Sequence, residues 1–458
     1  MTSHLRTSIS KSDLLWLLAI VLCAWIIPKT ALAQSLPVIE NPERYRLPSD
    51  MSRVSFYLIT VDVGDSVWDN FGHTALRMYD ENSNVDTVFN WGYFNLSGGV
   101  IGFSYNFFKG IMNYSLVTNT PAFEFAQYRR QERAVWQDKI NLTNSQKEIL
   151  YRRLMWNLEP DNIVYSYQYF FDNCTTKIRD YLNEALGGEI ATSYDGTASS
   201  TYRDQVRSHY ASVALIDFSL DILMNSNIDR PMTEWENMFL PINFRDRLRQ
   251  LPSNVAENGD KLELLSAPQM VMEFPPPQIQ TKGYRAASMA LLGPVLFLFL
   301  MLKKIPMSYF ATHSRLGLKA ESVNYRLFGL MGLLTAIFSG VYGLLMLGSW
   351  FISDHLDLHH NLNLLLFWPT DLFGILVALR WFLLCKPWPT DHNTLPFINY
   401  YILAHAIGMV IYTAAAVFGL SAQHLDGVLF NVVPGFFLFT ALVWLVGFEP
   451  TRPRTTFF

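Results

Sequence analysis

The chain has 458 residues, of which 50% are hydrophobic and 16% are charged, and its formal net charge is −4. This length predicts two or three structural units rather than one core. No basic patch is present, so nucleic acid is excluded as an expected partner. The apolar excess is concentrated toward the two ends of the chain, which is typical of a membrane protein.

Residues 1–33 are predicted to be a secretory signal peptide. Arg6 and Lys11 precede an apolar run from Leu14 to Ile27, and residues 31–33 form a small-x-small cleavage site. An uncleaved membrane anchor is the alternative interpretation of this segment.

Five apolar segments follow residue 284, each about the 17–25 residues that span a bilayer as a helix. They cover residues 285–302, 327–352, 362–384, 397–420 and 428–448. Lys and Arg residues follow the first, third and fifth segments, whereas the loops 353–361 and 421–427 contain neither. The positive-inside rule therefore places these two loops, and the region before the first segment, on the outer side of the membrane.

We expect an exported soluble domain at residues 34–270 and a tether at 271–284. The tether contains Pro275–Pro277, which favour an extended form. Residues 285–458 are expected to form an all-α membrane domain of about five transmembrane helices.

Cys174 is the only cysteine that the exported domain would keep after signal cleavage. Cys23 lies in the predicted signal peptide, and Cys385 lies at the inner end of the third apolar segment. Cys174 therefore has no disulfide partner within its domain. A catalytic nucleophile and a small buried apolar residue are the two interpretations that its isolation allows.

The stretch "FFDNCTTKIRDYLNEALGG" places Cys174 at the start of a predicted helix. Apolar residues at helical spacing follow it, Gly187 and Gly188 end the pattern, and Asp172 or Asn173 is a natural N-cap. The free N–H groups and the dipole of a first helical turn stabilise a thiolate. The preceding "IVYSYQYFF" predicts a strand, so the cysteine would lie at the end of a strand–turn–helix unit.

His73 is the better of two candidate bases in the exported domain. It begins the strand-like run "HTALRMYD", whereas His209 lies in a polar stretch that is predicted to be a solvated helix. If the following turn centres between residues 82 and 83, His73 faces Gly92, and Asn90 lies diagonally on the same face of the sheet. Asn90 would then accept the imidazole N–H and leave the other ring nitrogen for the thiol. A structural role for Asn90 at the strand end is the alternative.

These residues carry a family resemblance. The stretches "FYLITVDVGDSVWDNFGHTALRMYD", "FNWGYFN", "YQYFFDNCTTKIRD" and "DRPMTEWENMFLP" are similar to the Lnb-type N-terminal periplasmic domain, over most of residues 50–250. This family includes a bacterial lipoprotein N-acyltransferase. The resemblance implies an α+β, permuted papain-like fold of the NlpC-type group, with Cys174 as nucleophile and His73 as base. Asn90 matches the polar position of the family through "NWG", and Arg203 matches it through "TYRDQV" without an assigned role.

A Cys–His pair with an orienting Asn supports acyl transfer through a thioester. We therefore expect a thiol acyltransferase in the bacterial inner membrane, with its N-terminal domain in the periplasm. Phospholipid would be the acyl donor, and a lipoprotein amine is the acceptor that the resemblance implies. A cysteine amidase or peptidase for cell-wall peptides and a non-catalytic membrane scaffold are the alternatives.

No cofactor or metal is expected. The outward loop carries His355, His359 and His360, but no acidic or cysteine partner has the spacing of a zinc ligand. Asp371 lies in the polar break "WPTD" of the third segment, and an acid at that depth is expected to be buried against protein or to line a cavity. This edge of the membrane domain is expected to help admit lipid, with helix packing as the alternative.

Overall fold

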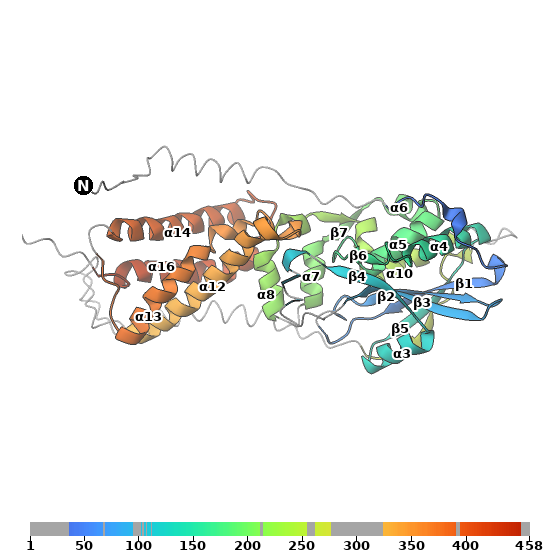
Figure 1. The fold of residues 1–458 in the computed structure, drawn as a ribbon. Coiled ribbons are helices and arrows are strands. Elements are labelled where there is room, and N and C mark those ends of the chain that lie inside the picture. Colours follow the sequence, from blue (N-terminus) through green and yellow to red (C-terminus); the bar gives the residue numbers. More distant parts are fainter. Residues whose placement is uncertain are drawn as a thin grey trace, which may run out of the picture.

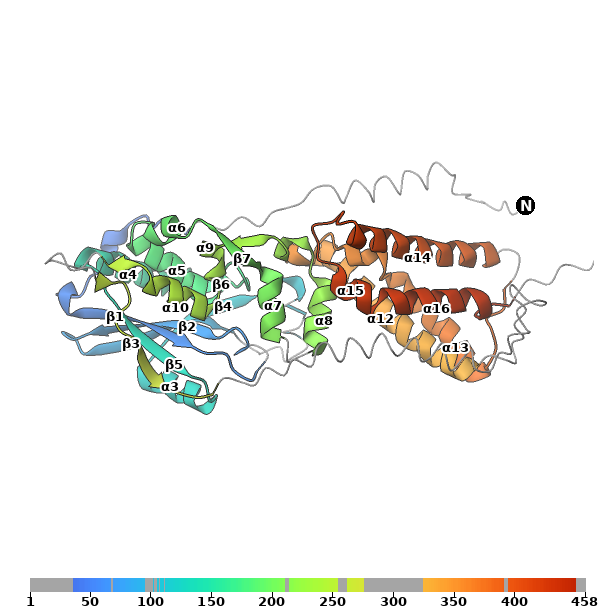
Figure 2. The ribbon, with the colours of Figure 1, turned by 180° about the vertical axis from the view of Figure 1, so that it is seen from behind.

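The structure of the chain is a computed structural model. It describes residues 36–66, 69–94, 112–210, 214–253, 262–275, 324–390 and 394–449, with short pieces between 102 and 110. The predicted signal peptide and the first predicted apolar segment, 285–302, lie outside these residues. Figures 1 and 2 show an elongated molecule with a mixed α/β domain at one end and a helical bundle at the other.

The N-terminal domain is built on a seven-stranded antiparallel sheet. The strand order is β11-β5-β1-β2-β3-β4-β6. The strands are β1 (Val54–Val61), β2 (His73–Asp80), β3 (Val85–Tyr93), β4 (Asn113–Asn119), β5 (Val135–Ile140), β6 (Val164–Ser166) and β11 (Gln269–Met272). Val271 and Met272, which the sequence assigns to the tether, therefore belong to this sheet.

Helices cover both faces of the sheet, because the strands carry apolar residues on alternate positions toward each side. One core contains Leu58, Leu76 and Phe89 together with residues of α4 (Asn144–Asn157), α5 (Cys174–Ala185) and α10 (Pro241–Arg249). The other contains Ile59, Ala75 and Val88 with Tyr128 of α3 (Pro121–Arg130). The smaller elements are α6 (Glu189–Ser193), β7 (Thr197–Thr201), α7 (Tyr202–Tyr210), β8 (Pro231–Thr233) and α9 (Glu234–Asn237).

The unit around Cys174 has the predicted helix but a shorter strand. The helix begins at Cys174 as predicted, and Gly187 and Gly188 end it with φ values of 67° and 91°. The strand before it, β6, covers only Val164–Ser166. Gln168 and Asp172 exchange backbone hydrogen bonds and close a turn, so the aromatic run leaves the sheet three residues after it enters.

The C-terminal part is helical and apolar. Its helices are α12 (Tyr325–Ile352), α13 (Gly374–Leu384), α14 (Thr394–Val417), α15 (Asp426–Asn431) and α16 (Val433–Val446). Within the described residues, α12 and α14 are long and apolar enough to cross a membrane, and a bent pair at 356–384 could form a third span. The helix axes of its two halves are bent by 61° relative to each other. The bend lies beside the polar break that contains Asp371. The helix α16 has 14 residues and is shorter than a full span.

Small residues on α12 allow the bent pair to pack closely against it. At Gly343 an added Cβ would lie 2.7 Å from the carbonyl oxygen of Phe367, and at Gly332 it would lie 2.9 Å from Ala378. Close backbone approach through small residues is the usual basis of helix association in membranes. Asp371 is held in this packing by Ser339, Tyr401 and His405, which all hydrogen-bond to its carboxylate.

The helix α8 (Ala214–Leu223) joins the two parts. Its Ile222 is fully buried in a core with Met346, Phe367 and Tyr412 of the membrane helices. Asn361 and Asn363 donate side-chain hydrogen bonds of 2.8 and 2.7 Å to the Ile222 carbonyl. The N-terminal domain is therefore docked onto the helical bundle through packed side chains, in addition to its covalent connection.

The loops that lack Lys and Arg are the ones that meet the N-terminal domain. In loop 353–361, the carbonyls of Leu356 and His359 accept hydrogen bonds from Asn225. In loop 421–427, the backbone N–H of His424 donates to Asp229 at 2.9 Å. Both loops thus lie on the side of the bundle that carries the exported domain, in agreement with the positive-inside prediction.

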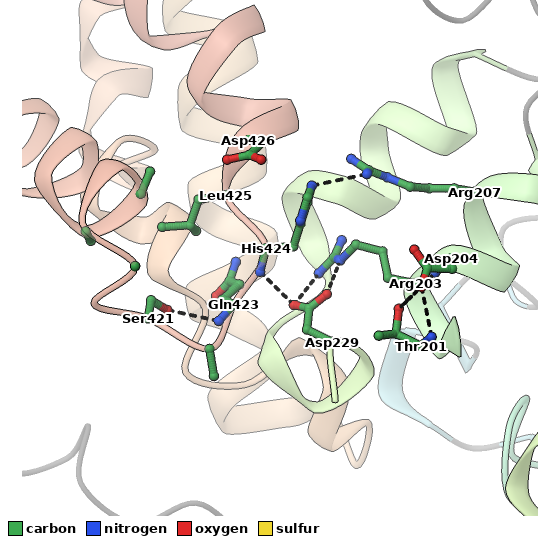
Figure 3. Close-up of a pocket in the computed structure, with 14 residues that line it drawn as sticks. Thr201, Arg203, Asp204, Arg207, Asp229, Ser421, Gln423, His424, Leu425 and Asp426 are labelled. Atoms are coloured by element: carbon green, nitrogen blue, oxygen red, sulfur yellow. Dashed lines mark hydrogen bonds and ion pairs between the residues drawn. The ribbon is translucent and has the colours of Figure 1, made fainter. Parts of the chain in front are cut away.

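Arg203 lies at this junction (Figure 3). Its guanidinium is buried and pairs with Asp229 at 2.5 Å and Asp221 at 3.1 Å. Arg207 also pairs with Asp221 and hydrogen-bonds to His424 of the membrane part at 3.1 Å. Arg203, Arg207 and Asp229 border a cavity of about 300 Å³ between the two parts. Arg203 therefore has a structural role in joining them.

Replacement of Arg203 by Met should destabilise the junction. Removing one partner of a buried ion pair typically costs about 3–5 kcal/mol, because the remaining charge stays buried. The measurement is the thermal unfolding midpoint of the purified full chain in detergent. The matched control is Arg230→Met, which removes an exposed pair with Glu236 and should cost less than about 1 kcal/mol. Equal losses in the two variants would contradict the assignment.

Candidate active site

The hairpin of β2 and β3 brings His73 and Asn90 together. The pairs run from Leu76–Phe89 to Asp80–Val85, so the turn centres between residues 82 and 83, as predicted. Continued by three residues, this register sets His73 opposite Gly92 and Asn90 on the face that His73 occupies. The Nε2 atom of His73 lies 2.8 Å from Oδ1 of Asn90.

Glu124 on α3 fixes the orientation of the Asn90 amide. The Asn90 Nδ2 donates to Glu124 Oε2 at 2.9 Å, so its Oδ1 is the atom presented to His73. The second carboxylate oxygen of Glu124 accepts from Asn119 Nδ2 at 2.6 Å. Because Asn90 accepts from Nε2–H of His73, the neutral imidazole keeps Nδ1 as an acceptor for the thiol. The sequence alone did not identify Glu124, since α3 meets β3 only through the tertiary fold.

Cys174 is the first residue of α5. Asn173 caps this helix, with its side chain accepting from the N–H groups of Thr175 and Thr176 at 2.8 and 2.9 Å. The adjacent strand at Gly92 has φ of 95°, and an added Cβ there would lie 4.0 Å from the Cβ of Cys174. Glycine at this position permits the backbone turn beside the thiol.

Cys174 and His73 form a coupled ionisable pair. Burial raises the pKa of the Cys174 thiol, but the positive charge of His73 and their hydrogen bond outweigh this effect and lower the pKa to about 7. Burial lowers the pKa of His73, whereas the negative charge of Cys174 and the same hydrogen bond raise it above its ordinary value. The arrangement therefore favours a thiolate–imidazolium pair near neutral pH.

Two threonines complete the surroundings of the sulfur. The backbone N–H of Thr74 donates to Sγ and contributes to the lowered pKa of Cys174. Sγ also lies 3.8 Å from Oγ1 of Thr175, which in turn lies 2.9 Å from Oγ1 of Thr74. Thr74 follows His73 directly, so strand β2 supplies both the base and a donor to the thiolate.

The N-terminus of α5 is less open than the sequence suggests. Two of its first N–H groups are occupied by Asn173, so they are not free to stabilise a substrate oxyanion. Arg133 supplies a second buried positive charge, which acts on both His73 and Cys174. Two nitrogens of its guanidinium are held by Asp62 and Asp69, and among the described residues its third nitrogen has no partner.

The other residues that the sequence predicts for the site lie outside the Cys174–His73 pair. Asp172 makes an ion pair with Lys177 at 2.9 Å, and Asn173 is the N-cap of α5. Arg203 belongs to the junction between the two parts of the molecule. His209 is in a helix as predicted, but it is half-buried and stacks on Phe71 with ring centroids 4.8 Å apart. His209 is therefore less solvated than the sequence predicts.

The histidines of loop 353–361 do not converge on a shared centre. His359 Nε2 contacts the Ser353 carbonyl at 2.8 Å, and the His360 ring lies 5.1 Å from Trp350. Across the described ranges, no group of three or more His, Cys, Asp and Glu side chains could hold a metal ion.

The fold and this site define a class of protein: a membrane protein whose mixed α/β domain holds a hydrogen-bonded Cys–His–Asn chain. Residues 41–208 match the family model described as the Lnb N-terminal periplasmic domain. The match includes His73, Asn90, Cys174 and Arg203. No curated protein and no solved structure matches the chain.

Alkylation of Cys174 by iodoacetamide should follow a titration curve with a midpoint at about pH 7. The rate should rise with pH because the thiolate, whose pKa is lowered, is the reacting form. In His73→Ala the charge that lowers this pKa is lost while burial remains. Its midpoint should therefore lie above the value of about 8.5 for an ordinary thiol. The measurement is peptide mass spectrometry over a pH series, with Cys385 as the internal control. Identical midpoints for the wild type and His73→Ala would contradict the pairing.

Proposed function

We propose that the protein is a membrane-bound thiol acyltransferase that moves an acyl group from phospholipid through a thioester on Cys174. The observation that supports this most directly is the buried thiol of Cys174 beside His73, whose ring is held by Asn90 at 2.8 Å, in a domain docked on membrane helices. In this proposal the domain is a permuted papain-like fold, and the membrane part spans the bacterial inner membrane five times.

The first half-reaction forms the acyl-enzyme. The Cys174 thiolate attacks the ester carbonyl of a phospholipid, and an S–C bond forms. As the tetrahedral intermediate collapses, the ester C–O bond breaks and His73 gives its proton to the departing lysophospholipid oxygen. The products are a thioester on Cys174, a lysophospholipid and a neutral His73. The charge of Arg133 favours the negative charge that develops on the carbonyl oxygen.

The second half-reaction restores the pair. A neutral amine attacks the thioester carbonyl, His73 accepts the amine proton, and the C–S bond breaks to release the Cys174 thiolate. An amide leaves, and the thiolate–imidazolium pair is ready for another donor. The acceptor that the family suggests is the N-terminal amine of a lipoprotein. Asn90 keeps Nδ1 of His73 directed at the sulfur in both steps.

The purified full chain in phospholipid should carry an acyl adduct on Cys174. Intact mass spectrometry should detect the added acyl group, and hydroxylamine should remove it, because the bond is a thioester. Cys174→Ala should carry no adduct, whereas Cys385→Ala, which removes the other thiol outside the predicted signal peptide, should be acylated like the wild type. Absence of an adduct together with Cys174-dependent cleavage of cell-wall peptides would replace this proposal by an amidase.

Glu124→Gln should slow acylation at least tenfold with little loss of stability. A neutral glutamine amide can turn Asn90 so that its NH₂ group faces His73, which favours the imidazole tautomer that cannot accept the thiol proton at Nδ1. The loss should not exceed the ~10²–10⁴-fold contribution of general acid–base catalysis. The measurement is the single-turnover rate of adduct formation, with the pH profile of Cys174 alkylation as a second readout. Glu81→Gln, at an exposed turn, is the control, and equal rates in both variants would refute the positioning role.

A further inference from the structure

A cavity of about 960 Å³ lies between the periplasmic domain and the membrane helices. One wall is the segment Tyr165–Asp172, which leads directly into Cys174. Another is α8, through Leu223 and Met224, and a third is the outer end of α12 with the loop that follows it. A ligand in this cavity would therefore touch both parts of the molecule. Its volume is at the upper end of the ~300–1,000 Å³ range of small-molecule pockets.

The outer end of α12 connects this cavity with the bilayer. Leu345 and Met346 line it, while Leu344, Phe351 and Ile352 nearby are 53%, 78% and 47% exposed. Exposed apolar side chains on a membrane helix are covered by acyl chains in a bilayer. The cavity wall is thus continuous with an exposed apolar surface of α12, which favours a lipid over a water-soluble ligand.

The charged part of the lining is predominantly acidic. It comprises six carboxylates, two permanent cations and one histidine: Asp161, Asp172, Asp180, Glu184, Asp354, Asp357, Lys177, Arg179 and His355. Three of the carboxylates have ion-pair partners, namely Asp172 with Lys177, Asp180 with Arg179 and Glu184 with Arg153. The net charge that faces a ligand is negative, so the lining favours a cationic headgroup.

Two buried polar atoms in this lining have no hydrogen-bond partner among the described residues. They are Oδ1 of Asp357, an acceptor, and the hydroxyl of Tyr165, a donor and acceptor. A buried polar group without a hydrogen-bond partner is destabilising, so each atom favours a ligand that completes it. An ammonium group would satisfy Asp357, and a phosphate oxygen would accept from Tyr165.

The cavity also lies within electrostatic reach of the proposed nucleophile. Tyr165 and Tyr167 both line it. Burial raises the pKa of each phenol, and the negative charge of Cys174 raises it further. A lipid headgroup beside these tyrosines would be held next to the segment that carries the thiol.

We propose that this cavity binds a phospholipid with a primary ammonium headgroup, with its ammonium at Asp357, its phosphate at Tyr165 and its acyl chains along α8 and α12. The assignment rests on the proposed function, because it makes this lipid the acyl donor. It adds a preference of the protein for one lipid headgroup, which the site formed by Cys174, His73 and Asn90 does not determine.

Native mass spectrometry of full-length Cys174→Ala tests binding without turnover. Phosphatidylethanolamine should be retained at least tenfold more strongly than phosphatidylglycerol or phosphatidylcholine of the same chains. Asp357→Asn should abolish the preference, whereas Asp426→Asn, at the separate 300 Å³ cavity, should keep it. Equal retention of the three lipids, or an unchanged preference in Asp357→Asn, would overturn the proposal.

A photoreactive phosphatidylethanolamine locates the lipid. Its crosslinks should fall on peptides that contain Tyr165, Met224 or Met346, and crosslinks confined to α14 and α16 would overturn the proposal. A lipopeptide with a free α-amine that displaces the lipid at lower concentration would assign the cavity to the acceptor and also overturn it. Selective binding without any adduct in the wild type would support the lipid site while rejecting acyl transfer. An adduct that forms equally from phospholipids with different headgroups would support acyl transfer and reject the headgroup-selective site.

Discussion

Asp80 closes the β2–β3 turn in a single register. Its Oδ1 accepts from the N–H of Asn82 at 2.9 Å, and its Oδ2 accepts from the Ser83 hydroxyl at 2.6 Å. Across the hairpin, Arg77 holds Asp86 with two hydrogen bonds of 2.8 and 2.7 Å. A slip of one residue would turn every β3 side chain to the opposite face of the sheet. Asn90 would then leave the imidazole and Glu124, and the thiol would lose a base with a defined tautomer. The chemistry proposed for Cys174 thus depends on the turn at residues 82 and 83, which is remote from Cys174 in the sequence.

Burial of the Cys174 thiol disfavours the reactive thiolate, but it also limits the access of oxidants and water to the sulfur. Removing Cys174 from water disfavours its thiolate, and His73, the Thr74 N–H and the Thr175 hydroxyl restore that form. The same burial limits access by oxidants in the periplasm, where an unpaired thiol is otherwise at risk. It also limits access by water, which competes with an amine for a thioester. A buried site is therefore better suited to acyl transfer than to hydrolysis, provided that the acyl donor arrives from the membrane side.

The features of the site that the sequence predicts are those formed by residues close together in the chain. The hairpin register follows from turn chemistry and the two-residue period of strands, and the Asn173 cap follows from the residues at the start of α5. Glu124 and Arg133 were not predictable, because they reach the site from elements that meet it only in the folded sheet. The strand before Cys174 was overestimated since its aromatic residues pack around a turn and do not extend β6. Local patterns carry no information about such long-range contacts.

Because α8 docks the N-terminal domain onto the helices, the tether is not the only segment that positions this domain. A proline-rich linker alone would leave the domain free to move above the bilayer, and the distance from Cys174 to a lipid would vary. The side-chain amides of Asn225, Asn361 and Asn363 instead bind backbone carbonyls across the junction, and Ile222 is buried among membrane helices. These contacts hold the thiol at one height and orientation relative to the outer ends of the helices. Reacting groups held in this way avoid the entropic cost of meeting by diffusion. Under the proposed function, the membrane helices would thus be part of the substrate site, which gives them a role beyond anchoring.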